Sequence, residues 1–142
     1  MQPTKTLRAL LVLSGMIALG IGGMILFDPA GFHATNGIDL GTDASLRSEV
    51  RAPGGALAVL GVMMMIGAFA KSFTTASTLI GAAVYLAYGA SRLLSIGLDG
   101  VPSPGIAGAA VIELTIGAAC AFAMRGARLA REGEGMPSKR PT

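Results

Sequence analysis

The sequence has 142 residues, a length that favours a single domain. Hydrophobic residues make up 52% of it and charged residues only 13%, whereas a soluble domain carries about 25% charged residues. This apolar balance excludes disorder for most of the chain. The net charge is +3, but the lysines and arginines lie at the ends of apolar runs and in the C-terminal segment. Nucleic acid is therefore not expected as a partner.

Four apolar runs are each long enough to cross a bilayer, which takes about 20 residues in a helix. We therefore predict an all-α fold, a four-transmembrane-helix bundle formed by residues 1–125. The charged segment 126–142 is expected to be a cytoplasmic tail that is disordered towards its end, beyond Arg131. The predicted spans are residues 9–27, 52–70, 76–98 and 105–124.

The first apolar run has a cleaved signal peptide as its alternative interpretation, because a basic segment precedes it. Its apolar core, 9–27, is longer than the roughly 7–15 residues of a signal peptide. Neither Ala30 nor Ala34 has a small residue two positions before it, as a cleavage site requires. We therefore expect an uncleaved helix.

The distribution of lysine and arginine predicts the orientation, because these residues are retained on the cytoplasmic side. If both termini are cytoplasmic, most basic residues lie on the cytoplasmic side and few lie in the outer half. We therefore predict that both termini are cytoplasmic. The inner set is Lys5, Arg8, Lys71, Arg125, Arg128, Arg131, Lys139 and Arg140, and the outer set is Arg47, Arg51 and Arg92.

The longest connection is the outer loop of residues 28–50, which contains several turn-forming residues and His33. Thr42 or Asp43 is placed to cap a helix that begins in this loop and continues into the second span. Pro53 predicts a kink or a fresh helix start, because proline lacks the backbone donor of a helical hydrogen bond.

Arg92 and Glu113 are the two deepest charges in the predicted spans, and they have opposite signs. At 1.5 Å per residue they lie roughly 8 Å and 12 Å below the turn that joins the third and fourth helices. Helices joined by a short turn are antiparallel neighbours, so these two side chains are expected to meet in the outer half of the bundle.

Other polar side chains share the helical face of Arg92, because residues three or four apart lie on one face. Both tyrosines belong to this stripe, and Glu49 and Arg51 lie at the outer entrance of the second helix. The predicted polar cluster comprises Glu49, Arg51, Tyr88, Arg92, Ser95, Asp99 and Glu113.

Three interpretations of this cluster remain open. It is a structural ion pair that fixes helix register, or a pocket for a small molecule or lipid headgroup, since charges at membrane depth are often functional. A proton relay through Glu113 is a third option. No metal site and no cofactor are expected, because the single His33 lacks ligand spacing. Cys120 is the only cysteine and forms no disulfide within the chain.

Three segments carry a family resemblance: SEVRAPGG at 48–55, ASRLLS at 90–95 followed by Asp99-Gly100 and Pro102, and AVIEL at 110–114. Over residues 7–125 the sequence resembles the small bacterial membrane proteins grouped as domain of unknown function family 4345. The resemblance implies a four-helix membrane domain, and it implies no activity. We expect the chain to be a multi-pass protein of the bacterial inner membrane.

For function, we expect a non-enzymatic structural or accessory subunit of a membrane complex, because no catalytic constellation is present. The alternative is a lipid-binding or small-solute-binding protein, or an oligomeric transporter, that uses an outer-leaflet polar pocket. A membrane enzyme would have to use Glu113 or Glu49 as its acid or base. The expected partners are the lipid bilayer and either other membrane subunits or further copies of this chain.

Overall fold

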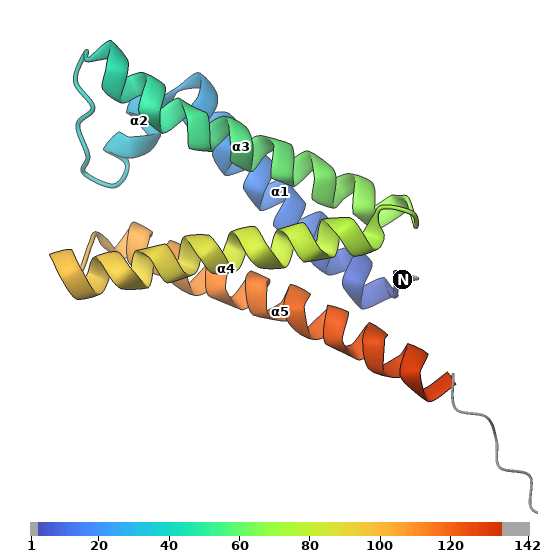
Figure 1. Cartoon of the computed structure of the whole chain (residues 1–142). Helices are drawn as coiled ribbons and strands as arrows, with labels where there is room; N and C mark the ends of the chain where they lie inside the picture. Colours follow the sequence, from blue (N-terminus) through green and yellow to red (C-terminus); the bar gives the residue numbers. More distant parts are fainter. Residues whose placement is uncertain (1–2, 135–142) are drawn as a thin grey trace, which may run out of the picture.

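The computed structural model describes residues 3–134, which form five α-helices and no strand (Figure 1). The all-α prediction is therefore confirmed for the described residues. Four helices are long and apolar enough to cross a membrane, as in a multi-pass membrane protein. These are α1 (Lys5–Phe27), α3 (Ala44–Phe69), α4 (Thr74–Asp99) and α5 (Pro104–Glu134), and the short α2 (Pro29–Ala34) follows α1.

The helix ends differ most from the predicted spans at the start of α3 and at the end of α5. The helix α3 begins at Ala44, because the side chain of Asp43 accepts a hydrogen bond from the Leu46 amide at 2.9 Å. It continues through Pro53, so the fresh helix start considered there is absent. The helix α5 runs to Glu134, past the predicted end of its span. Residues 135–142, the end of the expected tail, lie outside the described residues.

The helices α1 and α3 form a closely packed antiparallel pair in which glycines let the two backbones approach. A Cβ added at Gly61 would lie 2.6 Å from the Gly15 carbonyl oxygen, and one at Gly22 would lie 2.6 Å from the Gly54 carbonyl oxygen. Of the neighbouring glycines at 20, 22 and 23, only Gly22 lies at this close contact, and the other two face open space.

Two arginines form hydrogen bonds at the two ends of the α1–α3 pair. Arg8 of α1 donates its Nε–H to the Ala68 carbonyl at the end of α3, at 3.1 Å. Arg51 of α3 donates its Nε–H to the Leu26 carbonyl at the end of α1, also at 3.1 Å. Each arginine therefore satisfies a carbonyl that has no partner within its own helix.

The helices α4 and α5 form the second closely packed pair. Gly89 of α4 contacts Leu114 of α5, and Gly117 of α5 contacts Leu86 of α4. Each glycine therefore leaves room for a leucine side chain of the opposite helix.

The two pairs are joined by hydroxyl groups of α4 that donate to main-chain carbonyls. Thr74 bonds Gly67 at 2.8 Å, and Ser77 bonds Met63 at 2.7 Å. The Tyr85 hydroxyl reaches across to the Ser14 carbonyl of α1 at 2.7 Å. These bonds lie towards the end of the bundle that carries the N-terminus and the α3–α4 turn, which we call the N-terminal end.

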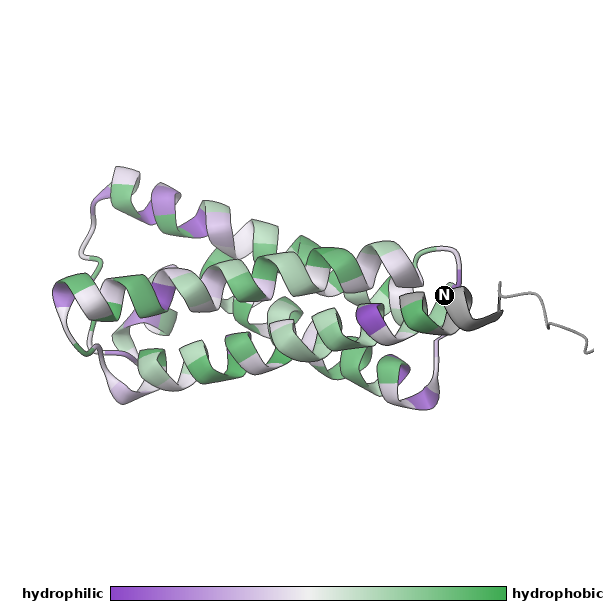
Figure 2. Ribbon diagram, turned by 60° about the horizontal axis from the view of Figure 1, so that its bottom comes forward, coloured by the Kyte–Doolittle hydropathy of each residue, from purple (hydrophilic) through white to green (hydrophobic). Residues whose placement is uncertain are grey.

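The pairs diverge towards the opposite end, which carries α2 and the α4–α5 turn and which we call the α2 end (Figure 1). A hydrogen bond from Ser103 to Asn36 at 3.4 Å connects the two sides there. Apolar residues dominate the middle of the long helices, and hydrophilic residues concentrate at their ends (Figure 2). The fold is therefore tight at one end and open at the other.

The glycine contacts predict that Gly61→Ala destabilises the bundle. The added methyl group meets the Leu19 and Gly15 backbones, which cannot move as a flexible side chain can. We expect a loss of about 1–3 kcal/mol, the usual cost of overpacking, measured as a lower melting temperature in detergent. Gly20→Ala is the matched control, because its Cβ meets nothing within 4 Å. Equal melting temperatures for the two variants would contradict the close approach.

Candidate functional site

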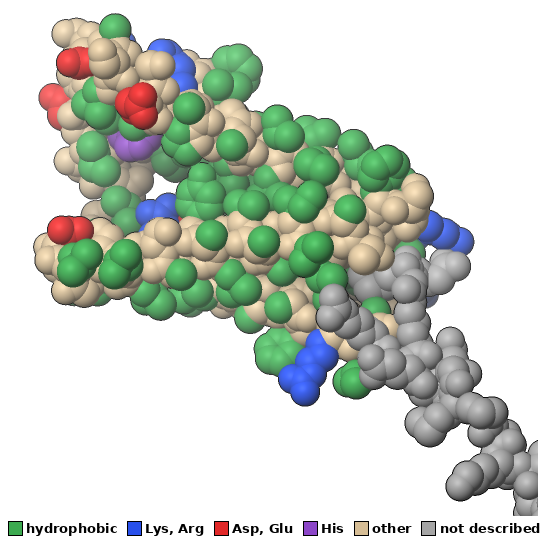
Figure 3. Space-filling model, viewed as in Figure 1, with side chains coloured by type: hydrophobic (Ala, Val, Ile, Leu, Met, Phe, Trp, Pro, Cys, Tyr) green, Lys and Arg blue, Asp and Glu red, His purple; other side chains and the backbone are tan. Residues whose placement is uncertain are grey.

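A cavity of about 320 Å³ lies between the two helix pairs, where they diverge. All five helices contribute to its wall. In the space-filling view the hollow opens towards the α2 end, with the histidine on one side and a basic side chain on the other (Figure 3). The wall is mostly apolar, with Ile17, Ile21 and Ile25 of α1 on one side and Val84 of α4 and Ile112 of α5 on the other.

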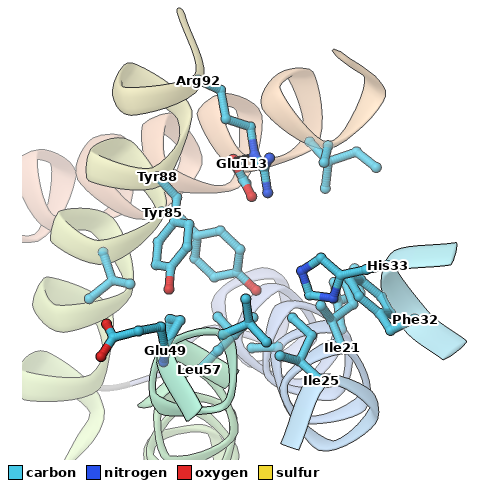
Figure 4. Close-up of a pocket in the computed structure, with 17 residues that line it drawn as sticks. Ile21, Ile25, Phe32, His33, Glu49, Leu57, Tyr85, Tyr88, Arg92 and Glu113 are labelled. Carbon is cyan, nitrogen blue, oxygen red and sulfur yellow. Dashed lines mark hydrogen bonds and ion pairs between the residues drawn. The ribbon is translucent and has the colours of Figure 1, made fainter. Parts of the chain in front are cut away.

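The ion pair of Arg92 and Glu113 forms one side of this cavity (Figure 4). The Arg92 Nε lies 2.8 Å from the Glu113 Oε2, so the bond is a charge-assisted hydrogen bond. The side chains are 31% and 14% exposed, respectively. The packing of α4 on α5 therefore places the two deepest charges together and leaves one edge of the pair open to the cavity.

The guanidinium of Arg92 has N–H donors that the ion pair does not use. It has five N–H groups, and the bond to Glu113 uses the one on Nε. Among the described residues, no side chain or carbonyl accepts from its two terminal nitrogens. A ligand oxygen in the cavity can therefore bind Arg92 without displacing Glu113.

Two tyrosines of α4 separate the charged part of the cavity from its apolar part. The Tyr85 side chain is buried, and its hydroxyl is committed to the Ser14 carbonyl. Tyr88 lies one helical turn nearer to Arg92 and is half-buried in the wall. Both rings lie between the ion pair and the helices α1 and α3 (Figure 4).

Glu49 of α3 and His33 of α2 line the cavity across from the ion pair (Figure 4). The His33 Nδ1 lies 2.8 Å from the Pro29 carbonyl oxygen. Since a carbonyl only accepts, Nδ1 carries the proton, and Nε2 of the neutral ring is left as an acceptor. The short helix α2 begins where Asp28 caps the Gly31 amide at 3.0 Å, and this turn brings His33 over the cavity.

The structure gathers some residues of the predicted cluster and separates others. Glu49, Tyr88, Arg92 and Glu113 all line the cavity. Arg51 does not, because its guanidinium caps α1.

Ser95 and Asp99 also lie apart from the cavity. They are exposed on α4 and bond each other at 3.0 Å. The helix pairs have diverged at their level (Figure 1), and both side chains are exposed.

Sequence reasoning did not assign His33 to the site. It treated His33 as a solvated loop residue, and no metal or catalytic spacing contradicted that interpretation. The Asp28-Pro29 pair was a usable signal, because aspartate followed by proline is a common start of a helix. Among the described residues, no group of three or more His, Cys, Asp and Glu side chains is placed to hold a metal ion.

Comparison with known families gives a match over residues 6–124 to the family described as Domain of unknown function (DUF4345). The chain belongs to this family. The resemblance predicted from the three sequence segments is thus confirmed. The matched region contains every residue that lines the cavity. No curated protein and no solved structure matches the chain.

The ion pair predicts that Arg92→Leu and Glu113→Gln each lower the melting temperature in detergent. Each variant leaves its partner without a counter-charge, at a cost on the order of 2 kcal/mol for a partly exposed pair. The loss of stability in the double variant is expected to be smaller than the sum of the losses in the two single variants. Ser95→Ala is the control, because Ser95 bonds only the exposed Asp99. A loss of stability in the double variant equal to that sum would contradict an energetic coupling between Arg92 and Glu113.

Proposed function

We propose that this protein binds an amphipathic molecule in the cavity between its two helix pairs. The observation that carries the proposal is the change in polarity along the cavity. The polar lining residues His33, Glu49, Arg92 and Glu113 lie towards the α2 end. On α4, Val84 lies eight residues deeper than Arg92, or roughly 12 Å. A polar head near the ion pair and an apolar chain beside Val84 would match this arrangement.

The size of the cavity favours one chain over two. Cavities of about 300–1,000 Å³ hold drug-sized ligands, and this one, at about 320 Å³, lies near the lower limit. Burial of each methylene group stabilises binding by about 0.8 kcal/mol. A single short apolar chain is therefore enough to give useful affinity.

We further propose that the chain crosses the bacterial inner membrane with both termini in the cytoplasm. Lys5, Arg8 and Lys71 all lie at the N-terminal end of the bundle, as the positive-inside rule requires of a cytoplasmic end. The α2 end then faces outwards. In this orientation the polarity of the cavity is that of a lipid in the outer leaflet, with its head outwards and its chain inwards.

A structural or accessory subunit is the second candidate. The direct 2.8 Å bond between Arg92 and Glu113 favours it, because such a bond fixes the register of α4 on α5 without any ligand. In this role the exposed apolar faces would contact other membrane subunits or a second copy. A transporter formed by several copies would be an elaboration of the binding role, since it would use the same cavity.

The proposed orientation is tested by labelling single cysteines with a membrane-impermeant maleimide in intact cells. Cys120 is buried and is first replaced by alanine. Asp39→Cys, in the exposed loop at the α2 end, should then be labelled from outside. Ser72→Cys, in the exposed α3–α4 turn, should be labelled only after the cells are opened. The reverse pattern would overturn the orientation.

The binding role is tested by filling the cavity. Ala109→Phe places a ring in the cavity wall, and we expect at least a tenfold loss of affinity for single-chain phospholipids in native mass spectrometry. Ala121→Phe is the control, because Ala121 is an exposed residue of α5 outside the cavity wall. A wild-type protein that binds no amphiphile, or an Ala109→Phe protein that binds as well as wild type, would overturn the proposal.

A further inference from the structure

We propose that the ligand of this cavity is a single-chain membrane lipid whose head carries an ammonium group, and that Glu49 recognises this group. The inference rests on the proposed function, because it names the chemistry of the ligand for the same cavity. It follows from the charges that line the cavity and from the partners that each of them already has.

The charged groups of the lining are unequal in number. The lining contains two carboxylates, Glu49 and Glu113, and one guanidinium, Arg92. The Arg92–Glu113 bond neutralises one charge of each sign. Glu49 is an exposed residue of the lining, and no salt bridge within the described part of the chain neutralises its charge. The open end of the cavity therefore favours a ligand that brings a positive charge.

The arginines next to Glu49 do not neutralise it. Arg47 and Arg51 are two residues away on either side, and residues two apart on a helix point in different directions. Both are also engaged elsewhere, Arg47 with the Gly41 carbonyl and Arg51 with the Leu26 carbonyl. Within the described part of the chain, no basic side chain approaches the Glu49 carboxylate to form a salt bridge.

Arg92 and His33, the other polar groups considered, can bind the remaining parts of a lipid head that carries an ammonium group. The terminal nitrogens of Arg92 offer donors to a phosphate or ester oxygen, and guanidinium groups bind such oxygens well. The Nε2 of the neutral His33 ring, which also lines the cavity, is a further acceptor for polar N–H groups of a ligand. A head with an ammonium at one end and an oxygen acceptor next to it therefore meets a partner at both positions.

A head without an amine fits less well. A fatty acid, or a phosphoglycerol head, would place its negative charge in a cavity that already has an excess carboxylate. Its oxygens would bind Arg92, but nothing in it would neutralise Glu49. The amine-bearing lipid is therefore favoured for two reasons. Its head can contact both Glu49 and Arg92, and a head without an amine is repelled by the excess carboxylate.

The test compares two probes that differ only in the head. One is a single-chain phosphoethanolamine lipid, and the other is the phosphoglycerol lipid of the same chain length. Each is titrated into the full chain in mild detergent at low salt, with native mass spectrometry as the readout. We expect about fivefold tighter binding of the phosphoethanolamine lipid, equivalent to about 1 kcal/mol, and a smaller preference at high salt.

Glu49→Gln is expected to abolish this preference by weakening phosphoethanolamine binding alone. Asp99→Asn is the matched control, because it removes a carboxylate at the same end of the bundle that does not line the cavity. It should retain the preference. Melting temperatures of both variants establish that the fold is intact.

The possible failures are distinguishable. If both lipids bind wild type equally and Ala109→Phe weakens both, the cavity binds lipid, and the recognition of an ammonium group is wrong. Recognition by Glu49 is also wrong if Glu49→Gln keeps the preference, or if Asp99→Asn loses it to the same extent. If neither lipid binds, this inference and the proposed function both fail.

Discussion

The arrangement of the bundle depends on the hydroxyl groups of α4 that bond main-chain carbonyls of the other helix pair. Thr74 and Ser77 bond carbonyls of α3, and Tyr85 bonds the Ser14 carbonyl of α1. In a hydrocarbon environment, water offers no competing partner to these hydroxyls. All three lie in the half of α4 nearer the N-terminal end. The two pairs are thus held together mainly at this end. At the other end, among the described residues, a side-chain hydrogen bond from Ser103 in the α4–α5 turn to Asn36 in the loop after α2 joins the two sides.

The cavity is a consequence of this one-sided attachment. Glycine contacts make α1 and α3 one rigid pair, and the glycines of α4 and α5 allow the same in the second pair. Two stiff pairs joined at one end diverge towards the other, and the space between them is wider than the lining isoleucines and tyrosines can fill. The charged lining residues lie at the wide end, where a polar ligand head or water can reach them and where the cost of a charge in the membrane is smallest.

The arginines near the α2 end show how the same residue type is used in different ways. Arg51 satisfies a helix carbonyl, Arg47 satisfies a loop carbonyl, and Arg92 pairs with Glu113. Because the first two are committed to backbone oxygens, they are not available to Glu49. Among the described residues, the exposed carboxylate of Glu49 therefore forms no salt bridge. A structural ion pair needs only Arg92 and Glu113, so Glu49 is the residue at which the proposed ligand binding can be tested separately from the structural role.

The sequence by itself determined the four long apolar helices, a helix cap at Thr42 or Asp43, and the meeting of Arg92 with Glu113. These features depend on local hydrophobicity, on capping chemistry and on the depth of two residues in adjacent antiparallel helices, all of which can be counted along the chain. Only the tertiary structure decided that Arg51 leaves the cluster, that Ser95 and Asp99 face away from the cavity, and that His33 enters it. The reason is that these placements depend on the divergence of the helix pairs and on the turn of α2, and both arise from contacts between residues far apart in the sequence.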